Sequence, residues 1–214
     1  MSLRPDSPLG KILTKLLELV VLQLYFILTS VPVFTIGAGL TAMFSVCRKM
    51  QRDDFTSVTR VYFQEFKASF GKSTAAWLIL GSAGALLGIS ISYYYHMAGA
   101  LRIVPLVIAC LLLVIVYIEF LYVFPLLAWF DNSLSGHFKN APVLAVLHLK
   151  STLLTTALYA FVFLLMVPVL PITLLIAFSG SAFYATLLLT KVFASHDPEA
   201  ALPREEETGG QTDD

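Results

Sequence analysis

Charged residues are scarce in this sequence. Only 13% of the 214 residues are Asp, Glu, Lys or Arg, whereas 57% are hydrophobic, and the mean hydropathy is +0.81. Soluble domains carry roughly 25% charged and about 45–50% apolar residues. The shortage of charge therefore excludes an ordinary soluble domain and predicts an all-α, polytopic membrane protein in contact with the lipid bilayer.

Cysteine and catalytic motifs are also sparse. Cys47 and Cys110 lie far apart in apolar context, which gives neither metal-ligand spacing nor a disulfide framework. His137 and His148 lack a third ligand at a suitable spacing. The sequence contains no GxSxG, no HExxH and no phosphate-binding glycine loop. We therefore expect no enzyme active site, no metal, no cofactor and no surface suited to nucleic acid.

The acidic residues are distributed unevenly. Seven of the fourteen lie in the last eighteen positions, and residues 196–214 show no apolar periodicity. Such a composition predicts a disordered acidic tail after a helical membrane domain at residues 1–195. The basic residues before the first apolar stretch resemble a signal peptide, but the apolar segments that follow favour an uncleaved first membrane helix.

Four apolar segments after residue 73 are long enough to cross a bilayer, which takes about 20 residues. They cover residues 74–95, 103–129, 141–167 and 171–191. The segment 48–73 carries six basic residues, whereas the connections near residues 100 and 168 carry one and none. The positive-inside rule then predicts that residues 48–73, residues 131–139 and both termini face the cytoplasm.

The apolar run of residues 12–47 is interrupted by Pro32, Gly37 and Gly39. Proline cannot continue a helix, and glycine favours a turn. Because both ends of the run are predicted inside, residues 31–39, with Thr35 among them, are predicted to form the outer turn of a short helical hairpin. A re-entrant hairpin and a single kinked helix with its N-terminus outside are the alternatives.

Residues 54–70 have the period of an amphipathic helix. Apolar side chains recur at steps of three and four, at Phe55, Val58, Tyr62, Phe66 and Phe70. This pattern predicts a separate helix that lies flat on the cytoplasmic leaflet. A cytoplasmic helix packed on the ends of the membrane helices, or on a partner, is the alternative.

Small residues recur at helical spacing in two of the membrane segments. They are Gly81, Gly84 and Gly88 in the first, and Ala177, Ser181 and Ala185 in the last. Small side chains let membrane helices approach closely. We expect both stripes to serve packing within the chain, with a dimer or partner interface as the alternative.

Glu119 is the one charged residue in the apolar segment 103–129. A carboxylate in hydrocarbon is costly unless it is paired or protonated, and such residues are often functional. Helix lengths place His148 and Lys150 at the same depth on the next segment. We expect Glu119 to pair with one of these two, either as a structural ion pair or as an intramembrane functional site.

Three stretches together resemble a known family. They are LTSVPVFTIGAGLTAMFSVCRKM, FQEFKASF and YVFPLLAWFDNSLSGHFKNAPVLAVLHLKSTLL. The chain before its acidic tail is similar to the YesL-type integral membrane proteins, a bacterial family of unknown function, although Trp129 stands where that family often carries Arg. The resemblance implies a protein of the bacterial cytoplasmic (inner) membrane, commonly encoded beside sugar ABC transporters, with no catalytic residues to carry over.

The leading functional hypothesis is therefore a non-enzymatic accessory protein. It would work with a carbohydrate ABC uptake or polysaccharide-utilisation system and contact the permease subunits. The alternative is a small transporter that acts alone as a homo-oligomer. Its route would need polar groups at mid-depth, and besides Glu119 the sequence offers hydroxyls such as Thr29, Ser82 and Thr155.

Overall fold

The computed structural model describes residues 8–52, 57–166 and 170–194, and within these ranges the regular elements are all helices. They are α1 (Pro8–Thr29), η1 (Val33–Thr35), α2 (Ile36–Gln51), α3 (Val58–His96), η2 (Ala100–Arg102), α4 (Ile103–Trp129), α5 (Leu134–Leu147), α6 (Leu149–Met166) and α7 (Leu170–Ala194). The predicted all-helical fold is confirmed. The termini and the acidic tail at residues 196–214 lie outside the described residues.

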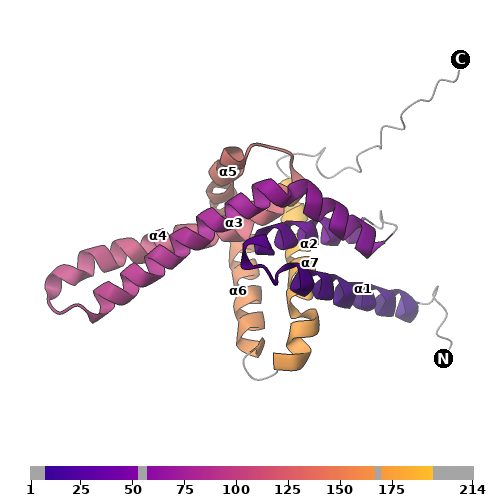
Figure 1. Cartoon of the computed structure of the whole chain (residues 1–214), viewed down its shortest axis with the longest axis horizontal. Coiled ribbons are helices and arrows are strands. Elements are labelled where there is room, and N and C mark those ends of the chain that lie inside the picture. Colours follow the sequence, from indigo (N-terminus) through magenta and orange to yellow (C-terminus); the bar gives the residue numbers. More distant parts are fainter. Residues whose placement is uncertain (1–7, 53–56, 167–169, 195–214) are drawn as a thin grey trace, which may run out of the picture.

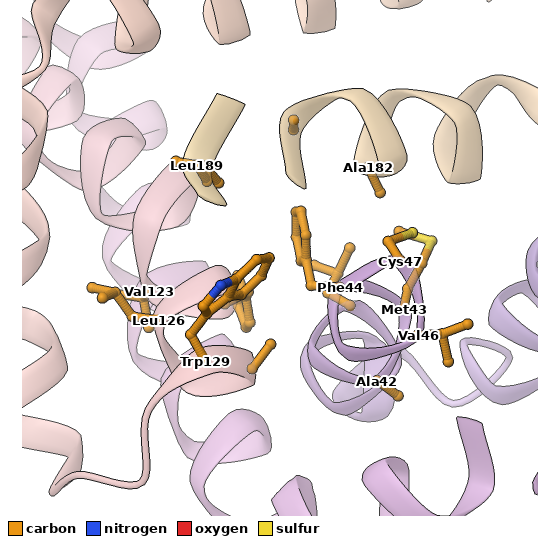
Figure 2. Close-up of a cluster of buried hydrophobic side chains, with 14 of the residues drawn as sticks. Ala42, Met43, Phe44, Val46, Cys47, Val123, Leu126, Trp129, Ala182 and Leu189 are labelled. Atoms are coloured by element: carbon orange, nitrogen blue, oxygen red, sulfur yellow. The ribbon is translucent and has the colours of Figure 1, made fainter. Parts of the chain in front are cut away.

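The short helix α2 lies at the centre of the molecule. Residues 37–47 are buried without exception, because α1, α3, α4 and α7 all pack against this helix. Its small residues, which are Gly, Ala, Ser and Thr, let four neighbouring helices approach at once. Figure 2 shows the core where α2 faces α4 and α7, with Phe44, Trp129 and Leu189 among the buried side chains.

The break between α1 and α2 occurs at Pro32, as predicted. α1 ends at Thr29, and the chain passes through η1 into α2. The buried Thr35 ties this turn together, since its hydroxyl donates to the backbone oxygen of Pro32 at 2.6 Å and also to that of Thr29. The turn is therefore closed by its own side chain.

α3 is a single helix of 39 residues, about 58 Å long at about 1.5 Å per residue. The separate helix predicted at residues 54–70 is wrong, because residues 58–70 continue into the apolar half without a break. No proline interrupts residues 58–96, and one glycine in a helix costs only about 1 kcal/mol. Of the predicted apolar face, Val58 and Tyr62 are buried and Phe66 is half-buried, but Phe70 is 37% exposed. Gln64, predicted off this face, is exposed. Phe55 lies outside the described residues.

α3 and α4 form a long arm that extends beyond the other helices (Figure 1). Among the described residues, these two helices are long and apolar enough by themselves to cross a membrane, which confirms the segments predicted at 74–95 and 103–129. Only 6% of the most apolar stretch of α4 is buried inside the protein, so the surface of this helix is suited to contact with lipid. At the tip, the guanidinium of Arg102 donates to the backbone oxygens of Tyr95 and Met97.

The segment predicted as one helix at residues 141–167 is divided, and that prediction is wrong. α5 begins after Ser133, whose hydroxyl accepts a hydrogen bond from the Gly136 backbone, and it ends at His148. α6 then leaves at an angle of 99°. The bent pair is a broken span or a re-entrant loop, and it counts as a third candidate crossing only if both halves form one span. α6 and α7 lie side by side and point away from the arm (Figure 1).

Candidate functional site

An apolar groove of about 540 Å³ runs along the arm between α3 and α4. One side of the groove is formed by small residues of α3, including Gly81 and Ala85, and the other side by α4 residues such as Leu113 and Tyr117. It begins beside Trp77, where α3 leaves the body of the protein. The groove is almost wholly apolar, which suits a hydrocarbon chain or a helix in the membrane.

Within the part of the chain that the structure describes, the glycine stripe of α3 makes little packing contact, contrary to our expectation. A Cβ atom built at Gly81 or Gly88 would meet no atom within 4 Å, and at Gly84 it would meet only a methyl group of Val116, at 4.0 Å. The stripe of α7 behaves as expected, because Ser181 and Ala185 are buried. The side chain of Ala177 lies outside the described part of the chain.

Gly37 and Gly39 lie inside α2, and their predicted place in the outer turn is wrong. A Cβ atom at Gly37 would lie 2.3 Å from the backbone oxygen of Ser73 and 2.6 Å from Cβ of Trp77. At Gly39 it would lie 3.1 Å from the ring of Phe26. These glycines therefore serve close approach of helices. At the same crossing, the hydroxyl of Ser73 bonds to that of Thr41 at 2.8 Å.

Glu119 does not pair with either predicted partner. Its side chain is half-buried on α4, and its Oε2 atom is buried without a hydrogen-bond partner among the described residues. His148 forms the break between α5 and α6, and Lys150 is exposed at the start of α6. The predicted pairing assumed that residues 141–167 form one straight helix beside α4. The bend at His148 divides this segment, so the assumption does not hold.

The bond that does join α4 to α6 was missed. The hydroxyl of Tyr122 lies 2.7 Å from that of Thr152, and both side chains are buried. Thr152 also donates to the backbone oxygen of Ala145 at 2.9 Å. A tyrosine in an apolar helix usually needs a partner for its hydroxyl, which was the available signal.

Two glutamines attach α7 to its neighbours, and neither contact was predicted from the sequence. The side-chain oxygen of Gln23, on α1, accepts a hydrogen bond from the backbone N–H of Ser179 at 2.8 Å. The side-chain nitrogen of Gln51, at the end of α2, donates to the backbone oxygen of Phe183 at 2.8 Å. Gln23 is only 2% exposed, so its amide serves α7 and not solvent.

A polar cluster lies where α3 passes the end of α4. Lys72 forms an ion pair with Asp131 at 2.7 Å and donates to the backbone oxygen of Asn132. His137 is 1% exposed, bonds to the backbone of Asn132, and keeps Nε2 without a hydrogen-bond partner within the described ranges. Because the Lys72 and Asp131 side chains are 50% and 84% exposed, their ion pair is a surface contact of small energetic weight.

Beside this cluster, Arg48 lies over the ring of Trp129. Its guanidinium carbon is 5.4 Å from the ring centroid, and the group donates to the backbone oxygen of Trp129 at 3.3 Å. The indole also contacts the ring of Phe193, near the end of α7, with centroids 5.3 Å apart. The departure from the family pattern at Trp129 thus coincides with a cation–π contact.

These features do not assemble into a recognisable catalytic constellation. No group of three or more His, Cys, Asp and Glu side chains that could hold a metal ion occurs in the described ranges. Cys47 is buried and Cys110 exposed, and neither is in a disulfide. The body does contain hydroxyls that are buried without a hydrogen-bond partner in the described structure, at Ser45, Thr155 and Thr186.

Comparisons with known proteins point to a family of unknown function. Residues 19–91 match a family model described as a protein of unknown function, DUF624. An uncharacterized protein of Bacillus subtilis (strain 168), YteU, is 32% identical over 146 residues, which cover 68% of this chain. The chain spans 65% of the length of that relative. No solved structure matches the chain significantly.

Proposed function

We propose that this chain is a DUF624-type membrane protein, more narrowly a YesL-type one, and that it acts as a non-enzymatic accessory subunit of a carbohydrate uptake transporter. The family match and the similarity to YteU support the broader assignment. The three sequence stretches quoted above support the narrower one. The carbohydrate system is suggested by the family resemblance alone.

One observation carries the accessory role, namely the unfilled groove of the α3–α4 arm. Membrane helices associate where small residues let their backbones approach, typically in small-xxx-small patterns. Gly84 and Gly88 have this spacing, yet among the described residues a Cβ atom at Gly84 would meet only a methyl group of Val116, and one at Gly88 would meet no atom within 4 Å. A transmembrane helix of a permease subunit is the occupant that this function requires.

We place the protein in the bacterial cytoplasmic membrane, with the basic ends of α2 and α3 on the cytoplasmic side. Six basic residues lie at positions 48–72, whereas the tip of the arm carries only Arg102. The positive-inside rule orients α3 accordingly. Cytoplasmic termini and a multi-pass arrangement follow if α1 and α2 form a hairpin within the membrane.

Site-specific photocrosslinking in intact cells tests this function. A benzophenone amino acid at Leu113, in the groove, should form an adduct with a permease subunit. The matched control is Leu112, which is exposed on the same helix but does not line the groove. Gly84→Leu, which fills the groove, should abolish the Leu113 adduct while the protein still reaches the membrane.

Other outcomes would contradict the accessory role. If Leu113 forms an adduct only with a second copy of this chain, the homo-oligomer alternative is favoured. If Leu113 and Leu112 react equally, or if no protein adduct forms, the groove does not hold a partner helix.

A transporter is the second candidate. The buried hydroxyls of Ser45, Thr155 and Thr186, together with Glu119, support it, because unpartnered polar atoms in an apolar body are costly and often mark a route for a polar solute. Uptake of sugars into proteoliposomes that contain only this protein would favour this candidate. Such uptake should be lost in Glu119→Gln if Glu119 lies on the route.

A further inference from the structure

The last helix ends beside the basic end of the protein. Phe193 is 2% exposed and contacts the rings of Trp129 and Phe130, with centroids 5.3 and 5.5 Å away. Arg48 lies on the same indole. The chain therefore leaves α7, whose last residue is Ala194, next to the last turn of α2.

Basic side chains are in excess at this end. Residues 48–72 contain six basic and three acidic residues. Lys49 has an acidic partner in Glu65, at 3.2 Å. Arg60 and Lys67 are exposed on α3, and within the described residues neither has an acidic partner. Since they are seven residues apart, they lie on the same face of the helix, with the exposed Gln64 between them.

The segment that follows α7 has the opposite charge. Residues 195–214 contain seven carboxylate side chains and only one basic side chain, Arg204. Any flexible chain of 20 residues extends about 25 Å on average, and about 65 Å when stretched. The stretch of α3 that carries Arg60 and Lys67 is only about 10 Å long. A tethered segment of opposite charge also has a high effective concentration at this surface.

We propose that the acidic tail at residues 196–214 docks on the basic face formed by Arg60 and Lys67 of α3, beside Lys49 and Arg52. The tail would then act as an internal counterion and exclude other acidic groups from this face. The competing occupants are the headgroups of anionic lipids, which basic residues at a membrane surface also attract. Attachment of the tail three residues after Phe193 favours the tail over a free ligand.

Spin labels measure the docking directly in the full-length protein. With Cys47 and Cys110 replaced by Ala, single cysteines at Gln64 and Thr208 carry the two labels, and the protein is placed in nanodiscs of phosphatidylcholine. At about 50 mM salt we expect a short, narrow distance distribution. At about 500 mM salt, where screening is stronger, we expect the broad distribution of a free coil.

Charge variants show whether short distances between the labels come from contact of the tail with the basic residues or from a compact tail. Arg60→Gln with Lys67→Gln should remove the short distances at low salt, whereas the charge-conserving pair Arg60→Lys with Lys67→Arg should retain them. All four substitutions are at exposed positions, so the variants should fold. Distributions that respond neither to salt nor to the neutral pair would overturn the proposal.

Nanodiscs that contain phosphatidylglycerol decide between the two occupants. Short distances that persist in this lipid support the tail. Their loss in phosphatidylglycerol, with retention in phosphatidylcholine alone, would show that lipid headgroups displace the tail and overturn the proposal for a bacterial membrane. Neither result depends on a permease partner, so the docking and the accessory role are tested separately.

Discussion

The backbone oxygen of Ser73 occupies the space in which a side chain at Gly37 would begin, only 2.3 Å from the position of a Cβ atom. This contact fixes how closely the central helix α2 crosses α3. Alanine at Gly37 would favour the helical backbone by about 1 kcal/mol, but its methyl group would clash with the backbone oxygen of Ser73.

Gly37→Ala is expected to destabilise the protein in detergent by about 1–3 kcal/mol, or to prevent its accumulation, because a helix carbonyl cannot rotate away from the new methyl group. Gly71→Ala is the matched control, since a Cβ atom there meets nothing within 4 Å. Thermal unfolding followed by size-exclusion chromatography measures both. Equal midpoints for the two variants would show that the crossing is looser than described.

Tyr62→Asp is expected to destabilise the protein by more than about 3 kcal/mol. Tyr62 is 0% exposed and shares a hydrogen bond of 2.6 Å with Thr29, so the change buries a carboxylate in its place. Gln64→Asp, on the exposed face two residues away, should leave stability within about 0.5 kcal/mol. The same unfolding assay applies, and comparable losses at both positions would contradict the burial of this face.

Glu119→Leu is expected to retain or raise stability. Because Oε2 has no hydrogen-bond partner in the described structure, the substitution removes a costly polar atom and leaves no partner unsatisfied. Glu119→Gln should also fold. If Glu119→Leu unfolds while Glu119→Gln does not, the carboxyl group has a partner that requires a polar side chain.

The two ends of the arm should face opposite sides of the membrane. A cysteine at Ala98 should react with an impermeant maleimide on intact cells, whereas one at Ser135 should react only after permeabilisation. Ala98 is preferable to its neighbour Gly99, whose φ of +104° disfavours any side chain. Cys110 is replaced by Ala, and the buried Cys47 is retained. Reaction of both positions from one side would exclude a crossing arm.

Features set by local sequence were predictable. α1 ends at Thr29, shortly before Pro32, because proline lacks an N–H and its ring clashes with the preceding turn. The helix at residues 103–129 follows from an apolar run longer than the bilayer needs. The small-xxx-small pattern of α3 was likewise visible, since it depends only on spacing.

Features set by neighbours distant in the chain were not predictable. Glycine suits both a turn and a helix crossing, and only the position of Ser73 assigns Gly37 to the crossing. Whether the small residues of α3 face another helix of the chain depends on where α4 lies. The bend at His148 has no local breaker residue. The depth estimate that paired Glu119 with His148 or Lys150 assumed a straight helix at this position and was wrong.

The continuous α3 also makes the protein a mechanical lever. The crossing at Ser73 lies about 22 Å from the start of the helix at Val58 and about 35 Å from its end at His96. A rigid rod that pivots at this crossing moves its far end about one and a half times as far as its near end. Any ligand that tilts the basic end of α3 would thus displace the tip of the arm, without a hinge between them.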